Sequence, residues 1–65
     1  MGTFVVYIDN AGEFRWYLMA ENEKIADSAE GYRSRQDCEN GIRLVKRMAP
    51  KAKLEAPPKK VEVLV

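Results

Sequence analysis

The chain has 65 residues and a formal net charge of +1 at pH 7, and it contains one cysteine and no histidine. A domain this small buries only about 60% of the surface that its unfolded chain exposes, so it needs a further source of stability. This composition excludes an internal disulfide and a metal site built from clustered histidine and cysteine ligands. We therefore expect one small domain that holds no metal or cofactor and gains stability by forming a homodimer.

Charge is divided unevenly along the chain. Residues 1–32 hold two basic and six acidic groups, a net charge of −4, and residues 33–65 hold nine basic and four acidic groups, a net charge of +5. Opposite charges in the two halves can steer one copy of the chain onto another. The N-terminus has no secretory signal and the chain has no long apolar run, so we expect a cytoplasmic protein without membrane contact.

The N-terminal segment is typical of a β-hairpin. Thr3 to Asp9 (TFVVYID) is rich in β-branched and aromatic residues, and Glu13 to Ala20 (EFRWYLMA) follows as the return strand. Gly12 suits the left-handed position of a three-residue turn. If Asp9 pairs with Glu13, six apolar side chains share one face of the sheet, namely Phe4, Val6, Ile8, Phe14, Trp16 and Leu18. We expect a helix to cover this face, with Trp16 at the centre of the core.

The same register places a second set of side chains on the opposite face, namely Val5, Tyr7, Arg15, Tyr17 and Met19. This face is too apolar for a freely solvated surface, yet one helix covers only one side of a sheet. Either the C-terminal tail or a second copy of the chain must lie over it. We favour the second copy, because dimerisation also compensates for the small size of the domain. These five residues are the predicted dimer interface.

A short third strand is predicted after the hairpin. Glu21 to Lys24 form the next turn, with Asn22 and Glu23 as its expected central pair. The following segment, Ile25 to Ser28 (IADS), is the strand, and its first residue pairs near Ala20. A polar connection then leads to the helix.

The segment Ser34 to Ala49 is periodic enough for a full helix, whose apolar stripe consists of Cys38, Ile42, Val45 and Ala49. Ser34 is a good N-cap, because its hydroxyl accepts a hydrogen bond from a backbone amide of the first turn. Pro50 ends the helix, since the residue before a proline resists the helical conformation. Gly41 inside the helix costs about 1 kcal/mol relative to alanine, so we expect it to let another backbone come close.

The predicted fold class is α+β, with a three-stranded antiparallel meander and one amphipathic helix in a single unit at residues 1–49. Residues 50–60 are polar, lysine-rich and marked by prolines, which indicates a linker. Residues 61–65 (VEVLV) alternate well enough to form a C-terminal fourth strand, which completes a β-β-β-α-β order. This strand pairs either within its own chain or with a partner.

Three separated motifs resemble the YegP-like family of small uncharacterised prokaryotic proteins, namely DNAGEFRW at 9–16, IADSAEGY at 25–32, and CENGI at 38–42 with Val45 and Lys46. The resemblance covers residues 3–49 and implies a meander followed by a helix, present singly or in tandem. It also implies that single-unit members pair as homodimers. It implies no activity and no catalytic residues. The usual Asn-Gly of the second turn is replaced here by Asn22 and Glu23.

No catalytic constellation is evident in the sequence. A thiol near a helix start gains thiolate character, but Cys38 has no histidine partner and lies on the apolar stripe, so we expect it to pack in the core. Asp27 and Glu30 resemble an acid–base pair, yet no companion nucleophile or electrophile accompanies them. We therefore predict no catalytic residues.

The predicted function is that of a small non-enzymatic, homodimeric interaction module. The alternative is a weak nucleic-acid-binding protein that uses the lysine-rich tail and the basic helix face, namely Arg33, Arg35, Arg43, Lys46 and Arg47. We rank this alternative second, because a basic surface without a recognised binding motif is weak evidence. A steep salt dependence of oligonucleotide binding would distinguish it from the interaction module.

Overall fold

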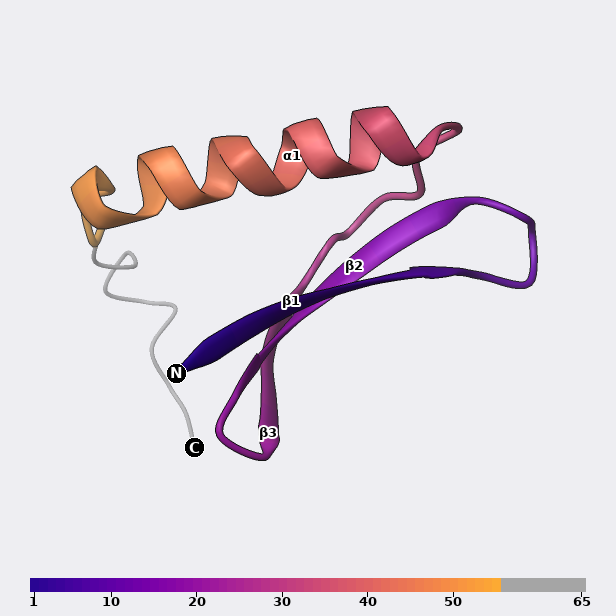
Figure 1. Ribbon diagram of the computed structural model, residues 1–65. Helices are drawn as coiled ribbons and strands as arrows, with labels where there is room; N and C mark the ends of the chain where they lie inside the picture. Colours follow the sequence, from indigo (N-terminus) through magenta and orange to yellow (C-terminus); the bar gives the residue numbers. More distant parts are fainter. Residues whose placement is uncertain (56–65) are drawn as a thin grey trace, which may run out of the picture.

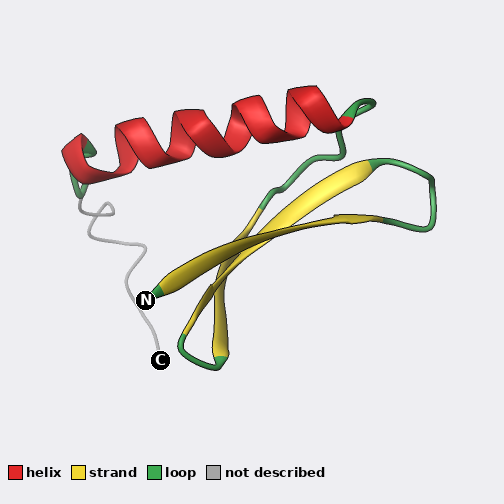
Figure 2. Cartoon of the chain, viewed as in Figure 1, coloured by secondary structure: helices red, strands yellow, loops and turns green. Residues whose placement is uncertain are grey.

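The computed structural model describes residues 1–55 as a three-stranded antiparallel sheet with one helix packed on it (Figures 1 and 2). The elements are β1 (Gly2–Ile8), β2 (Phe14–Ala20), β3 (Glu23–Asp27), the helix α1 (Arg35–Met48) and a short 3-10 helix, η1 (Ala49–Lys51). The strand order is β1-β2-β3, and α1 packs on β1 and β2. The predicted α+β class and meander are confirmed. The predicted strand at 61–65 lies outside the described residues.

The first hairpin has the predicted register, with the inner pairs Phe4 with Leu18, Val6 with Trp16 and Ile8 with Phe14. Gly12 has a φ of 81°, a conformation that carries little penalty for glycine. Asp9 closes the turn: its backbone N–H donates to the carbonyl oxygen of Glu13 at 2.9 Å. Its Oδ1 also accepts hydrogen bonds from the backbone N–H groups of Ala11 and Glu13, both at 2.9 Å.

The second turn differs from the prediction. Ala20 pairs with Glu23, so the two central residues are Glu21 and Asn22, and the expected central pair of Asn22 and Glu23 is wrong. Glu21 has a φ of 60°, so a glutamate takes the left-handed conformation that favours glycine or asparagine. β3 therefore begins at Glu23, ahead of the predicted start of the third strand.

A β-bulge follows this turn in β3. Leu18 pairs with Ala26 while the next residue of β2, Met19, pairs with Lys24, which leaves Ile25 as an extra residue on β3. A bulge changes the relation between sequence spacing and register, so strict alternation does not give the pairing of β3 on both sides of Ile25.

The connection between β3 and α1 continues the hydrogen bonding of the sheet. The backbone N–H of Ser28 donates to the carbonyl oxygen of Trp16 at 2.9 Å, and the backbone N–H of Trp16 donates to Ser28 Oγ at 3.1 Å. Farther along, Phe14 and Tyr32 exchange two backbone hydrogen bonds of 2.8 Å each. These bonds hold the connection against β2, so the start of α1 is placed relative to the sheet.

The helix begins and ends close to the predicted residues. Ser34 is the N-cap, and its Oγ accepts a hydrogen bond from the backbone N–H of Asp37 at 3.1 Å. α1 ends at Met48, but Ala49 keeps a helical conformation (φ −53°, ψ −44°) and Pro50 lies in η1, where its fixed φ is tolerated in the first turn. The expectation that the residue before Pro50 resists the helical conformation is therefore wrong. Among the described residues, no helix has the length and apolar character needed to cross a membrane.

Gly41 gives room to an aromatic ring, and the expected close approach of another backbone is wrong. A Cβ atom built at Gly41 would lie 2.7 Å from Tyr32 Oη and 3.2 Å from Tyr32 Cζ. Tyr32 belongs to the connection that is hydrogen-bonded to β2, and its ring packs under the helix. The glycine therefore sets how closely α1 approaches this ring.

The core lies between α1 and the inner face of the sheet. Its three buried apolar residues are Trp16, Cys38 and Ile42, which are 6%, 0% and 8% exposed. Phe4 meets the Trp16 ring edge to face, with ring centroids 5.3 Å apart. Ile8, in contrast, is 60% exposed, because α1 leaves the turn end of the inner face uncovered. The prediction that the helix covers this whole apolar face is thus correct only for part of it.

Candidate interaction surface

The residues predicted for a dimer interface alternate along β1 and β2 with the residues that pack on the core, so they lie together on the face of the sheet away from α1. The pairs on this face are Val5 with Tyr17, Tyr7 with Arg15 and Thr3 with Met19. We call the predicted set the outer sheet surface, which consists of Val5, Tyr7, Arg15, Tyr17 and Met19. Tyr7 is 40% exposed and the other four are half-buried by their neighbours in the sheet. The predicted set is therefore a contiguous surface.

Two tyrosines form the centre of this surface. The rings of Tyr7 and Tyr17 lie 5.7 Å apart between centroids, with an angle of 49° between their planes. Lys24 Nζ lies 5.1 Å from the centroid of the Tyr17 ring, within the range of a cation–π contact. Rings of this kind provide large apolar area with little conformational freedom, which is typical of residues that dominate protein interfaces.

An ion pair fixes the arginine at the edge of the surface. Arg15 Nε donates to Asp9 Oδ2 at 2.6 Å, and both side chains are mostly buried, with 31% and 19% exposed. The Arg15 guanidinium, helped by the backbone N–H of Glu13, holds the pKa of the Asp9 carboxyl below its usual value. The hydrogen bond to Asp9 uses only the Nε–H group, which is one of the five N–H donors of the guanidinium. Arg15 is thus oriented by its own chain and can still donate to a partner.

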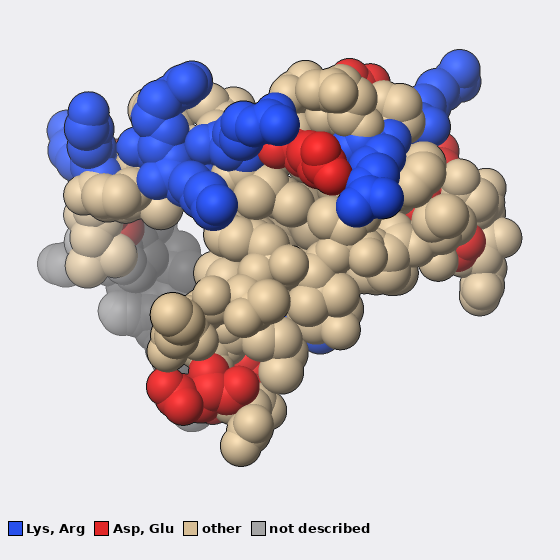
Figure 3. Space-filling view, viewed as in Figure 1, with Lys and Arg blue, Asp and Glu red and all other residues tan. Residues whose placement is uncertain are grey.

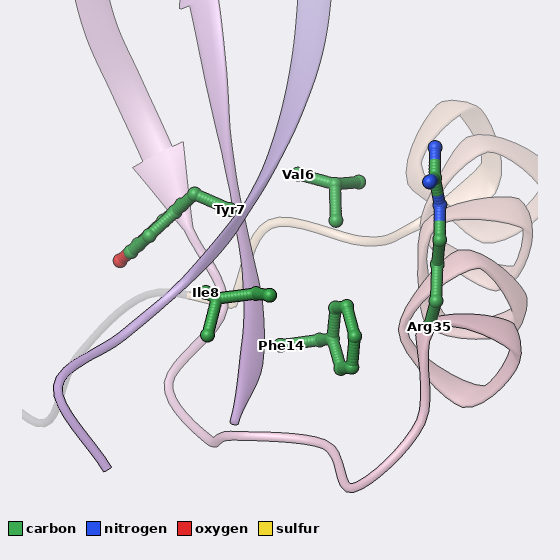
Figure 4. Close-up of a pocket in the computed structure, with 5 residues that line it drawn as sticks. All are labelled: Val6, Tyr7, Ile8, Phe14 and Arg35. Carbon is green, nitrogen blue, oxygen red and sulfur yellow. The ribbon is translucent and has the colours of Figure 1, made fainter. Parts of the chain in front are cut away.

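A hollow of about 160 Å³ lies on the inner face of the sheet, at the turn end of the first hairpin, and borders the outer sheet surface only at Tyr7. It is lined by Val6, Tyr7, Ile8, Phe14 and Arg35 (Figure 4). The side chains of Val6, Ile8 and Phe14 point toward the helix, while Tyr7 points away. Arg35 Nε donates to Glu39 Oε2 at 2.9 Å at the rim. Ligand pockets usually occupy about 300–1,000 Å³, so this hollow fits a side chain rather than a metabolite.

The sequence did not predict this hollow. Its floor belongs to the apolar face that we expected the helix to cover, and Arg35 was considered only as a contact for nucleic acid. The hollow exists because α1 begins beside the end of the hairpin and does not extend over it, which is a relation between elements that no local pattern encodes.

The basic residues of the alternative function are spread over two regions. Arg33 precedes the helix, and Arg35 in its first turn pairs with Glu39. The other three lie in the C-terminal half of α1, namely Arg43, Lys46 and Arg47. Arg35 and Arg47 are separated by about 18 Å along the helix at 1.5 Å per residue. Figure 3 shows Lys and Arg side chains gathered mainly over the C-terminal half.

The residues considered for catalysis are not brought together. Cys38 is fully buried in the core, and burial raises the pKa of its thiol, which fits the predicted packing role. Asp27 and Glu30 are both exposed. Within residues 1–55, no group of three or more histidine, cysteine, aspartate or glutamate side chains is arranged to hold a metal ion.

These features define a class: a small α+β unit in which a three-stranded meander carries one helix on its inner face and an aromatic, half-exposed outer face. Residues 9–55 match the family described as a domain of unknown function (DUF1508), and the chain belongs to this family. This match confirms the family resemblance predicted from the three motifs.

Relatives of similar and of greater length are known. The chain is 41% identical over 54 residues to a UPF0339 protein of Methanosarcina acetivorans, covering 83% of this chain and 93% of that protein. It is 47% identical over 49 residues to the "UPF0339 protein in ptx operon 5'region" of Stutzerimonas stutzeri, covering 75% of this chain but only 44% of that protein. The solution NMR structure of a protein from Haloferax volcanii is similar with a TM-score of 0.80 and 40% identity, covering 86% of this chain and 95% of that chain.

Proposed function

We propose that this chain is a small, non-enzymatic interaction module of the cytoplasm that works as a homodimer joined through the outer sheet surface. The observation that carries this proposal is the pair of tyrosines on a face that α1 leaves uncovered, with Tyr7 40% exposed beside Tyr17. Contiguous apolar patches on a soluble domain mark sites of protein contact. Tyrosine and arginine are both enriched in such interfaces.

The size of the core supports the same proposal. Within the described residues, only Trp16, Cys38 and Ile42 are buried apolar residues. A domain of this length needs a source of stability besides its core. Its single cysteine and lack of histidine argue against a disulfide and a metal site, so association with a second copy is the remaining source. Covering the outer sheet surface with its own copy would remove a second apolar layer from water.

The length of one relative is in keeping with two units per assembly. The matched stretch is 44% of the Stutzerimonas stutzeri protein, so that chain has room for a second unit of similar size. Two units in one chain could cover each other's outer sheet surface, as two separate chains do in the proposed dimer.

The test is the solution mass together with the identity of the contact. Light scattering at micromolar concentration should give twice the monomer mass. Isotope-filtered NOEs in a mixture of labelled and unlabelled chains should connect Val5, Tyr7 and Tyr17 across the two copies. A monomeric mass, or contacts only between residues of α1, would refute the proposal.

The alternative, a weak nucleic-acid-binding protein, has less support. Its five basic residues are divided between the two ends of α1, and Arg35 is already paired with Glu39. Titration of single- and double-stranded oligonucleotides tests it, because phosphate contacts make the affinity fall steeply as salt is raised. Binding that persists at physiological salt with such a slope would favour the alternative over the interaction module.

A further inference from the structure

The C-terminal half of α1 and the turn that follows it carry only positive charge. Residues 43–54 contain no acidic side chain and five basic ones, namely Arg43, Lys46, Arg47, Lys51 and Lys53. All five are exposed, and none forms an ion pair with another described residue. Basic residues in the last turn of a helix stabilise its dipole, but Lys51 and Lys53 lie beyond α1. The dipole of α1 therefore does not account for all of this charge.

Exposed apolar side chains lie among these charges. Leu44 and Met48 are 50% and 52% exposed, and Leu54, after the helix, is 98% exposed. The two helical residues each follow an arginine, Arg43 or Arg47, at about 100° around α1, so basic and apolar side chains share its solvent side. Figure 3 shows Lys and Arg side chains gathered over this half of the helix. We call residues 43–54 the basic–apolar segment.

The surface of an anionic bilayer matches both properties of this segment. Lipid headgroups supply negative charge, and clusters of about four to eight Lys and Arg residues are typical of segments that bind anionic lipids. The boundary between headgroups and acyl chains accepts the apolar side chains of a helix that lies in the plane of the membrane. Long basic side chains reach the headgroups while their apolar neighbours insert. Charge and exposed apolar area would therefore be satisfied together.

The shape of the segment favours a bilayer over other anionic partners. Leu44 and Met48 protrude from the solvent side of a single helix, so the surface is convex, and the hollow beside Arg35 lies at the other end of α1. A folded protein would need a groove that matches this convex surface, whereas a fluid bilayer adapts to it. Nucleic acid phosphates would neutralise the basic side chains but would leave Leu44 and Met48 in water.

We infer that the basic–apolar segment binds the surface of a bilayer that contains anionic lipids. α1 lies along the headgroups, with Leu44 and Met48 at the acyl boundary and the basic side chains beside the phosphates. We expected no membrane contact from the lack of a long apolar run, but a helix that lies on a membrane needs no such run. The outer sheet surface lies on the other face of the sheet and takes no part in this contact.

Vesicle binding by the full chain tests this inference. The probes are vesicles of phosphatidylcholine alone and vesicles of equal parts phosphatidylcholine and phosphatidylglycerol, separated from free protein by flotation. The wild type should bind the anionic vesicles about tenfold or more tightly than the neutral ones. Raising the ionic strength from about 0.1 M to about 1 M should weaken this binding about tenfold or more, because the Debye length falls from about 10 Å to about 3 Å. Equal binding to the two kinds of vesicle, or binding to neither, would overturn the inference.

Two variants separate charge from apolar insertion. Arg43→Gln with Arg47→Gln removes two charges, and Leu44→Gln with Met48→Gln removes the apolar side chains. Each should weaken binding to the anionic vesicles about tenfold or more. All four positions are exposed, and circular dichroism checks that both variants keep the fold. If Leu44→Gln with Met48→Gln binds as tightly as the wild type, the segment recognises charge alone and the inference is wrong.

The matched control removes two basic side chains at the other end of α1. Arg33→Gln with Arg35→Gln has the same net charge as Arg43→Gln with Arg47→Gln, but it should bind anionic vesicles nearly as the wild type does. An equal loss in both pairs would mean that net charge attracts the chain without a defined surface, which contradicts the inference. So would a wild type that leaves vesicles unbound and binds an oligonucleotide through Arg43 and Arg47, because the surface would then belong to nucleic acid.

A fluorescent side chain reports the depth of the contact. Trp16 is 6% exposed in the core and gives the same background in every variant. With anionic vesicles, the added indole of Leu44→Trp should emit at shorter wavelength and be quenched by lipids with brominated acyl chains. The added indole of Gln36→Trp, at an exposed position in the first half of α1, should do neither. Equal quenching of the two variants, or quenching of neither, would contradict insertion through Leu44 and Met48.

The same vesicles separate this contact from the proposed dimer. Tyr17→Glu should lose the dimer and still bind the anionic vesicles, because Tyr17 lies on the face of the sheet away from α1. If Tyr17→Glu loses vesicle binding, the outer sheet surface is part of the contact and the inference is wrong. A wild type that is monomeric and still binds through residues 43–54 supports the inference and refutes only the proposed dimer.

Discussion

Asp9 and Arg15 form an ion pair of 2.6 Å between Oδ2 and Nε that joins the first turn to the outer sheet surface. The other oxygen of the same carboxylate accepts backbone hydrogen bonds from Ala11 and Glu13 at 2.9 Å each. One side chain therefore orders the turn and orients the arginine of the candidate interface. The stability of the hairpin and the shape of the surface depend on the same carboxylate.

The first prediction concerns the pH dependence that this carboxylate gives to stability. Pairing lowers the pKa of Asp9 in the folded state, so the folded chain holds its proton less firmly than the unfolded chain does. The stabilisation is therefore present above the unfolded pKa of about 3.9 and is lost as the pH falls through the lower folded pKa. Thermal unfolding followed by Trp16 fluorescence should give a higher midpoint for wild type than for Asp9→Asn at pH 7, and the difference should close in acid.

The control for this experiment is Glu30→Gln, which removes an exposed carboxylate from the connection before α1. Its midpoint should follow that of the wild type at neutral and at acid pH. The difference in midpoint between wild type and Asp9→Asn could instead stay constant through the acid range. That result would show that the charge on Asp9 does not contribute to stability, and that the turn depends on hydrogen-bond geometry alone.

The second prediction concerns the contact between Gly41 and Tyr32. Alanine in a helix interior is normally about 1 kcal/mol more favourable than glycine. Here the added methyl would meet Tyr32 Oη at 2.7 Å and Cζ at 3.2 Å, and overpacking of this kind costs about 1–3 kcal/mol. Gly41→Ala should therefore lower the free energy of unfolding by about 1 kcal/mol, although propensity alone predicts the opposite sign.

Urea unfolding of a double-mutant cycle measures this directly. In a Tyr32→Phe background the nearest atom is gone, so Gly41→Ala should become neutral or stabilising, with a coupling of about 1 kcal/mol or more between the two positions. If Gly41→Ala stabilises the wild type, the ring moves away at little cost and the close approach has no structural role.

The third prediction concerns the accessibility of Cys38. The side chain is fully buried, and burial raises the pKa of its thiol, so both the exposure and the thiolate fraction are low. Reaction with an aromatic disulfide reagent in native buffer should be about a hundredfold or more slower than in concentrated urea, because the thiol reacts only when the core opens. A Gln36→Cys variant in a Cys38→Ala background provides an exposed thiol for comparison. Equal native rates for the two thiols would place Cys38 outside the core.

The hairpin register was predictable because local information determines it. Side chains alternate with a period of two, so once Gly12 is placed in the left-handed position of the turn, every inner and outer residue follows. The composition of the outer sheet surface follows from the same rule. Ser34 at the start of α1 was predictable for a similar reason, since a cap is a contact between residues three apart.

The second turn and the hollow depend on relations that no local pattern reports. The bulge at Ile25 shifts β3 by one residue, and the sequence around Glu21 has no glycine to mark the left-handed position. The exposure of Ile8 depends on where α1 begins relative to the end of β1. Such details are set by tertiary packing. This explains why the inner and outer faces of the sheet were predicted, while the second turn and the uncovered end of the first hairpin were not.

The last prediction tests the outer sheet surface at its centre. In the proposed dimer, a glutamate at position 17 would place a charge in a contact that excludes water, which is strongly unfavourable unless the charge is paired. In the separated chain Lys24 lies beside this position, 5.1 Å from the present ring centroid, so the variant should still fold. Light scattering should show a dimer that dissociates at least tenfold more readily, in the range of about 1–2 kcal/mol or more expected for an interface anchor.

Two controls make this result specific to the surface. Tyr17→Phe keeps the ring and should keep the dimer, while Ala11→Glu adds the same charge at an exposed position of the first turn and should leave the mass unchanged. Because the two glutamate variants have equal net charge, a difference between them can only come from where the charge lies. If Tyr17→Glu and Ala11→Glu have the same mass as the wild type, the rings of Tyr7 and Tyr17 do not lie in a dimer contact. The outer sheet surface would then not be covered by a second copy.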